Sequence, residues 1–202
     1  MGLLENTLII LLLIVISAFC STSEIALAAA RKLKLAQLAE NGDPRAATVL
    51  ALQSQPGYFF TTIQIGLNAV AILAGVLGEG AYSPLFTDAL QPHVGSAATA
   101  AMLGSILSFA LVTAAFVLLA DLLPKRVAIV APEAIALRIA RPMAFCIRLL
   151  SPLVWAFNGI ANLIMARFGL PETRPDDVTP ADIVALSRAG MNAGVVAEQE
   201  QQ

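Results

Sequence analysis

The residues best suited to chemistry lie inside a stretch that otherwise has the composition of a membrane span. Residues 8–30 run LIILLLIVISAFCSTSEIALAAA, long enough at ~1.5 Å per residue to cross a hydrocarbon core of ~30 Å. Ser17, Ser21 and Glu24 are spaced i, i+4 and i+7, so a helix presents them on one face. A carboxylate inside a span costs roughly 2.5–3.5 kcal/mol and is retained only where it meets water, protein or a cation. Glu24 is therefore either the structural partner of a basic residue near the cytoplasmic end or a ligand for a cation.

The composition is that of a membrane protein. Hydrophobic residues make up 58% of the 202 positions and charged residues only 13%, whereas soluble domains average ~45–50% and ~25%. The net charge of −2, with no basic patch interleaved with aromatic residues, argues against a nucleic-acid partner. The single histidine, His93, excludes a histidine-based metal site. Cys20 and Cys146 form no CxxC pair and imply neither a metal nor a disulfide.

The first apolar stretch is a retained span rather than a signal peptide. It has no basic residue before it, only Glu5, and it is longer than the ~7–15 apolar residues of a signal peptide. Arg31, Lys32 and Lys34 follow it at once. This stop-transfer pattern indicates that the N-terminus lies outside.

Two further segments, 58–80 and 97–120, are long and apolar enough to span the membrane. All twelve basic residues lie at 31–45 or 125–188, so the connection predicted at 81–96 has none. The positive-inside rule then predicts three spans, with the N-terminus outside and the C-terminus in the cytoplasm.

The remaining apolar segments predict amphipathic juxtamembrane helices. Residues 143–165 are hydrophobic, but Arg148 interrupts them, and Pro142 and Pro152 predict a path broken into short pieces. A fourth span would also place the downstream arginines outside, against the charge rule. Residues 31–55 alternate basic and apolar positions in the same way. Both segments are expected to lie in the inner leaflet with their basic side chains toward the headgroups. The predicted fold class is an all-α integral membrane protein.

The composition changes after residue 170. Residues 171–177 form a polar, proline-containing linker, and Thr179 can cap a helix that starts at Pro180. We expect 1–170 to be the membrane domain with its juxtamembrane helices, and 171–202 to begin a cytoplasmic acidic helical linker. The chain stops in what resembles a further helix, so we expect it to be part of a longer protein.

Four segments together resemble the CNNM/CorC family of membrane proteins: SEIALAAARKLKL, FFTTIQIGLNAVAILAG, LADLLPKRVAIVAPEAIAL and DIVALSRAGMNAGVVAEQE. The similarity covers essentially the whole chain. It implies a homodimer with three spans per chain and a belt of juxtamembrane helices. In family members an acidic helical bundle, a CBS-domain pair and often a CorC-type domain follow in the cytoplasm, and we expect the CBS and CorC parts to be absent from this chain. The family is associated with efflux of magnesium and other divalent cations.

The resemblance also implies where a transported cation binds. The matching positions are Ser21, Ser23 and Glu24 on the first span, Gln64, Gly66 and Asn68 on the second, and Asp121 and Lys125 on the third. Many members have Gly-Glu at the third site, whereas this chain has Ala120-Asp121, a shorter acid on a less pliable backbone. The LADLLPKR segment is most similar to the bacterial branch linked to export of the polyamines putrescine and cadaverine.

The residue types fit either substrate. Mg²⁺ requires oxygen ligands in an octahedral array, and Ser21, Ser23, Glu24 and Asn68 are the candidate ligands if it is the substrate. A diamine dication requires an acceptor at each end, for which Glu24 and Asp121 are candidates, and an apolar or aromatic wall between them. Four phenylalanines are candidates for that wall: Phe59, Phe60, Phe109 and Phe116.

Two neighbouring features have alternative interpretations. Lys125 snorkels to the inner interface, pairs with Glu24 or Asp121, or blocks the empty site; we favour pairing. Thr61, Gln64 and Asn68 form a polar stripe at i, i+3 and i+7, which serves either the cation path or hydrogen bonding between helices.

We therefore predict the membrane domain of a cation exporter for polyamines. Export of magnesium or another divalent cation is the first alternative, and a non-transporting regulator that anchors CBS domains is the second. No nucleophile elbow, phosphate loop or metal-ligand cluster indicates an enzyme. No cofactor is expected in this domain: Mg²⁺ would be a substrate, and ATP would bind only the missing CBS domains. The expected partners are the lipid bilayer of a bacterial inner membrane, the transported cation and a second copy of the chain, because three spans offer too little surface to enclose a polar path. The small-residue faces of the second and third spans are the predicted dimer contact.

Overall fold

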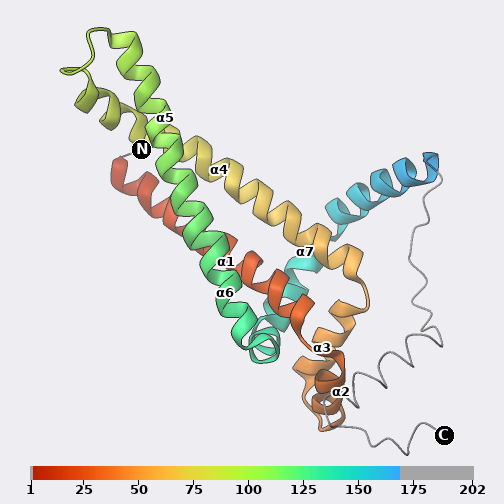
Figure 1. The fold of residues 1–202 in the computed structure, drawn as a ribbon. Helices are drawn as coiled ribbons and strands as arrows, with labels where there is room; N and C mark the ends of the chain where they lie inside the picture. The colour runs from red at the N-terminus through yellow and green to blue at the C-terminus, as the bar shows by residue number, and fades with distance from the viewer. Residues whose placement is uncertain (1, 169–202) are drawn as a thin grey trace, which may run out of the picture. The chain divides into compact units, whose positions relative to one another are not determined.

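The computed structural model describes residues 2–168, and every element in that range is a helix (Figure 1). Residues 2–159 belong to one compact unit, and residues 160–168 belong to a second. The all-α prediction is confirmed for the described residues. Within residues 2–168, four helical stretches are long and apolar enough to cross a membrane, one more than predicted. The three-span count thus stays a prediction, and the linker and helix predicted at 171–202 lie outside the described residues.

The first long helix, α1, spans Leu3–Ala29. At its start the Glu5 carboxylate accepts a hydrogen bond from the Gly2 backbone N–H at 3.0 Å. At its end the Gln53 side-chain nitrogen donates to the carbonyl oxygens of Leu27 at 2.7 Å and Ala30 at 2.9 Å. Carbonyls at a helix end lack partners within the helix, so Gln53 satisfies two of them from a different element.

Two short helices follow, α2 at Lys32–Glu40 and α3 at Pro44–Gln53. Gly42, with a φ of 89°, makes the turn between them. Asp43 caps α3 by accepting a hydrogen bond from the Arg45 backbone N–H at 2.9 Å. Hydrogen bonds from the Arg45 side chain hold the pKa of Asp43 below its ordinary value. The helical prediction for 31–55 is confirmed, while its place in the inner leaflet stays a prediction.

The next helix, α4, spans Pro56–Leu90 and is longer than the sequence indicated. The connection predicted at 81–96 is wrong for residues 81–90, which belong to α4. Pro84 lies inside the helix, where its missing N–H leaves the Gly80 carbonyl without the usual partner. Packing offsets this loss, because Ser83 and Thr87 lie directly against the next helix.

The third long stretch consists of α5 at Ala97–Ala115, the π-helix η1 at Phe116–Leu122 and α6 at Leu123–Val130. These three elements follow one another without an intervening turn. α5 packs along α4, while η1 and α6 pack against α1 (Figure 1).

The contact between α4 and α5 relies on glycines. A side chain at Gly78 would overlap Val112, and the Ser108 hydroxyl donates to the Gly78 carbonyl at 2.8 Å. Gly104 lies equally close to α4. Both glycines therefore allow close packing of α4 against α5 within the chain. At three other glycines of α4 an added Cβ would meet no neighbour within 4 Å: Gly57, Gly75 and Gly80.

The last helix of the described residues, α7, spans Pro132–Arg167 and contains both Pro142 and Pro152. The prediction that these prolines break the path into short pieces is wrong. Ile139 and Met143 are buried in the same core cluster as residues of α1, α2 and α3, so packing on one face supports the helix through Pro142.

Polar contacts also attach α7 to earlier helices. Glu133 accepts from Arg31 Nε at 2.8 Å and lies 3.4 Å from Lys34 Nζ. The Thr61 hydroxyl donates to Asn158 Oδ1 at 2.8 Å. Thr61, one member of the polar stripe on the second predicted span, therefore forms a hydrogen bond between helices.

Large apolar side chains remain exposed along the long helices. Leu12 and Val15 on α1 are 58% and 64% exposed, and Ile72 on α4 is 67% exposed. A soluble monomer rarely leaves such faces open to water. These helices therefore require lipid or another protein around them.

Candidate cation-binding site

The Lys125 ammonium lies between two carboxylates. Its Nζ is 2.7 Å from Asp121 Oδ1 and 3.3 Å from Glu24 Oε2. Asp121 and Lys125 are one helical turn apart, whereas Glu24 comes from α1. The predicted pairing of Lys125 is confirmed, with both acids rather than one.

Each carboxylate also has a neutral neighbour. The Ser21 hydroxyl donates to Asp121 Oδ1 at 3.0 Å, and Ser21 is fully buried. Gln64 Nε2 lies 3.5 Å from Glu24 Oε1, which is a long hydrogen bond. The structure thus brings five of the eight predicted site residues into one cluster, here called the acid–lysine cluster: Ser21, Glu24, Gln64, Asp121 and Lys125.

Glu24 is the least satisfied member of this cluster. Its side chain is 18% exposed, against 43% for Asp121 and 31% for Lys125. Glu24 Oε2 is buried and, among the described residues, has no hydrogen-bond partner. Its 3.3 Å contact with Lys125 therefore has the distance of an ion pair without the geometry of a hydrogen bond. A buried carboxylate oxygen with spare acceptor capacity is suited to bind another donor.

The π-helix explains how Asp121 reaches α1. The Leu123 backbone N–H bonds to the Leu118 carbonyl, five residues back, which is the π-helical spacing. Pro124 follows directly and cannot donate a backbone hydrogen bond, so the regular α-helical ladder is already interrupted there. The wider turn changes which side chains face α1, and π-helical turns occur frequently at functional sites. The sequence offered Pro124 as the only signal of this turn.

Three predicted residues lie beside the acid–lysine cluster without joining it. Ser23 is fully buried, and its hydroxyl donates to the Phe19 carbonyl of its own helix at 2.7 Å. A Cβ at Gly66 would lie 3.2 Å from Cys20 Sγ, so this glycine allows α4 to approach α1 closely. Asn68 is exposed and lines the groove described next.

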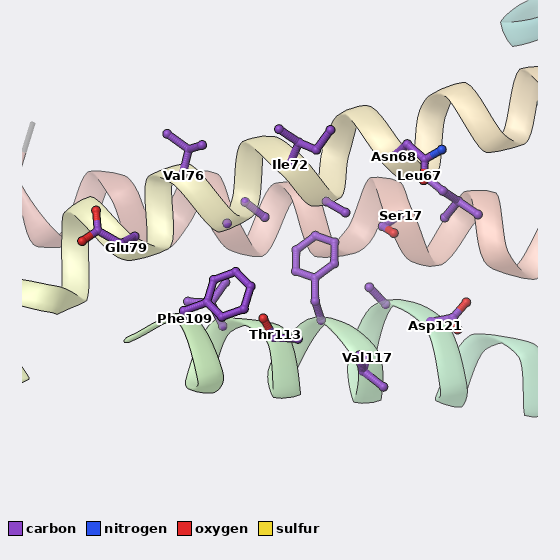
Figure 2. Close-up of a pocket in the computed structure, with 16 residues that line it drawn as sticks. Ser17, Leu67, Asn68, Ile72, Val76, Glu79, Phe109, Thr113, Val117 and Asp121 are labelled. Atoms are coloured by element: carbon purple, nitrogen blue, oxygen red, sulfur yellow. The ribbon is translucent and has the colours of Figure 1, made fainter. Parts of the chain in front are cut away.

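A groove of about 780 Å³ leads away from the cluster between α1, α4 and the α5–η1 stretch (Figure 2). Asp121, Asn68 and Ser17 lie at one end, and Glu79 lies at the other (Figure 2). The walls between these ends are largely apolar: Ala71, Ile72, Gly75, Val76, Phe109, Val112, Phe116 and Val117.

Two of the four phenylalanines predicted for an aromatic wall belong to this groove. Phe109 and Phe116 line it, whereas Phe59 and Phe60 pack against each other and line a separate cavity of about 290 Å³. The sequence did not single out Glu79, which belongs to no recognised motif.

The cluster contains oxygen atoms that suit a cation. The carboxylates of Glu24 and Asp121 and the hydroxyl of Ser21 lie around one ammonium group. Within residues 2–168 no three histidine, cysteine, aspartate or glutamate side chains gather as a metal site. The arrangement is that of two acids sharing an alkylammonium.

These features define a class: a multi-pass helical membrane protein in which acids from separate apolar helices meet around a polar site. The family model described as the cyclin M transmembrane N-terminal domain matches residues 8–200. The chain therefore belongs to the CNNM family, as its resemblance implied.

Several bacterial relatives carry the name polyamine export protein. Those from Escherichia coli K12 and Salmonella typhimurium 14028s are each 52% identical over 198 residues, which cover 98% of this chain and 44% of the relative. The relative from Haemophilus influenzae is 46% identical over 200 residues, which cover 99% of this chain and 46% of the relative. This chain thus spans less than half the length of these relatives.

Proposed function

We propose that this chain is the membrane domain of an exporter for short polyamines such as putrescine and cadaverine. The observation that carries the proposal is the Lys125 ammonium held between Asp121 and Glu24 at 2.7 and 3.3 Å. A lysine side chain is a primary ammonium on a four-carbon stem. It is the same chemical group as one end of putrescine, so Lys125 occupies the two acids as a substrate amine would.

The groove supports a substrate with an apolar middle. The methylene chain of a diamine can lie along the apolar wall, and its ammonium ends can approach the faces of Phe109 and Phe116. The names of relatives at 46–52% identity support the same substrate class. Transport rather than catalysis is the proposed activity.

Efflux of Mg²⁺ is the second candidate, favoured by the carboxylate and hydroxyl oxygens of the acid–lysine cluster. Mg²⁺ requires near-octahedral oxygen ligands at ~2.0–2.1 Å and sheds its water reluctantly. The carboxylates of Glu24 and Asp121 already lie at ion-pair distances from an alkylammonium, and Ser23 turns its hydroxyl to its own helix. These contacts favour an amine over the metal.

The membrane arrangement belongs to the same proposal. We propose that α1, α4 and the α5–α6 stretch span a bacterial inner membrane, with the N-terminus outside, the C-terminus in the cytoplasm and α7 along the inner surface. Residues 1–170 would form this membrane domain, and 171–202 would begin a cytoplasmic helical linker. Two copies would form a homodimer. The basic residues at 31–45 and 125–188 support this orientation.

A ligand series on the full-length protein in detergent tests the proposed substrate. The ligands are Mg²⁺, butylamine, putrescine and cadaverine, and the measurement is the shift in melting temperature. Because the second ammonium of a diamine can approach Phe109 or Phe116 while the first lies between the two acids, both diamines should stabilise the protein more than butylamine or Mg²⁺. A shift with Mg²⁺ alone would favour metal efflux, and no shift with any ligand would favour a membrane regulator.

The comparison needs a matched control. Asp121→Asn removes one acid of the cluster and should abolish the diamine shift. Glu40→Gln removes an exposed acid on α2, away from the cluster, and should leave the shift unchanged.

A further inference from the structure

The groove has a second acid at the end away from the acid–lysine cluster. Glu79 of α4 lines the groove and is exposed, and the Ser105 hydroxyl donates to its Oε1 at 2.9 Å. Ser105 also shares a hydrogen bond with Ser83 at 3.0 Å. Among the described residues, no lysine, arginine or histidine forms an ion pair with Glu79.

The groove follows one face of each of its two main helices. The lining residues of α4 recur with helical spacing from Asn68 to Glu79, and those of the facing stretch run from Phe109 to Asp121. Asn68 and Glu79 are eleven residues apart, so at ~1.5 Å per residue they lie ~16 Å apart along the axis of α4. Glu79 lies closer than Asn68 to the C-terminal end of α4 and so to the α4–α5 connection, which is the outer end in the proposed orientation.

The apolar surroundings of Glu79 make a charged carboxylate there energetically costly. Its neighbours along α4 include Val76 and Ile72, both more than 60% exposed and suited to lipid or an apolar partner. An acid among such residues is costly unless it faces a water-filled path or a cation. The Ser105 hydroxyl satisfies one acceptor position of a carboxylate that has about four.

We propose that Glu79 is a second binding site for a protonated amine, where the exported polyamine is held before release to the outside. The inference rests on the proposed function and adds to it a second binding step before release. The ligand is a primary ammonium on an alkyl chain, recognised by the Glu79 carboxylate and the apolar wall that leads to it.

A single diamine is too short to contact both sites at once. Cadaverine has six single bonds between its nitrogen atoms, and at ~1.5 Å per bond it reaches at most ~9 Å. It therefore cannot contact the acid–lysine cluster and Glu79 at once across a groove of ~16 Å. A diamine must leave the first acids before its leading ammonium reaches Glu79. Phe109 and Phe116 line the intervening path.

Glu79→Gln in the full-length protein tests the proposal, with two readouts. Putrescine flux into liposomes should fall about tenfold, because a charge-assisted contact at the second site is lost. The melting shift produced by putrescine should remain, because Asp121, Glu24 and Lys125 are untouched. Ser105→Ala should lower flux less, since it removes only the donor that orients Glu79. Asp88→Asn, on the same helix outside the groove, is the matched control and should transport normally.

The outcomes separate this inference from the proposed function. Unchanged flux in Glu79→Gln, while the wild type exports putrescine, overturns the second site alone. A lower melting temperature with normal flux per folded molecule also overturns it, because Glu79 would then serve only helix packing. A wild type that moves no amine overturns both.

Discussion

Glu24→Gln separates a transport role for Glu24 from a structural one. The substitution keeps the size of the side chain and removes its charge. Sequence reasoning alone predicts that a purely structural Glu24 would leave a buried base unpaired, at a cost of roughly 3–5 kcal/mol. The structure changes this expectation, because Lys125 keeps Asp121 at 2.7 Å after the Glu24 contact is lost.

The contacts indicate a small effect on stability. The lost ion pair spans 3.3 Å without hydrogen-bond geometry, and its members are 18% and 31% exposed. Partly exposed pairs contribute about 0–1 kcal/mol net. Removing the charge also removes the cost of burying Glu24 Oε2 without a hydrogen-bond partner. We therefore expect a loss of ~1 kcal/mol or less, equal to a decrease of ~2–4 °C in melting temperature for a chain of this size.

The assay combines putrescine flux in liposomes with thermal unfolding of the same preparation. We expect Glu24→Gln to abolish flux while the melting temperature decreases only slightly. Glu40→Gln makes the same chemical change at an exposed position and should alter neither. A large decrease in melting temperature with flux per folded molecule intact would refute the transport role. That result would make Glu24 a structural ion-pair residue.

Three further predictions concern topology, assembly and Lys125. In a variant without native cysteines, a single cysteine introduced at position 88 should react with a membrane-impermeant reagent added outside. A single cysteine at position 174 should react only from inside, and external labelling at 174 would refute the three-span arrangement. The full-length protein should be a dimer by mass measurement in mild detergent, and Gly80→Leu, at a position where an added Cβ has no neighbour within 4 Å, should weaken it; a monomeric wild type would contradict this. Lys125→Ala should increase the melting shift produced by putrescine, because the competing internal ammonium is gone, and a smaller shift would show that Lys125 helps to bind the substrate.

The polar face of the first span could be predicted from sequence because its cause is local. Helical spacing alone places Ser17, Ser21 and Glu24 on one side. The pairing of Lys125 with Asp121 follows equally from their separation of one turn. These positions carry most of the cluster, so its composition was predictable.

The features that escaped prediction depend on packing between helices. Pro84 and Pro142 are strong local signals for a break, yet contacts with neighbouring helices keep α4 and α7 continuous. Gln53 caps a different helix, which no spacing in the sequence indicates. Glu79 becomes notable only when α4 and α5 form the two walls of the groove.

Putrescine flux by the full-length protein in liposomes, measured for the wild type, Asp121→Asn and Glu40→Gln, tests most directly whether the acid–lysine cluster binds the exported amine. We predict that the wild type and Glu40→Gln export putrescine, that Mg²⁺ is not moved, and that Asp121→Asn is inactive although folded. Export of Mg²⁺ without putrescine, or full putrescine flux in Asp121→Asn, would contradict this function of the cluster.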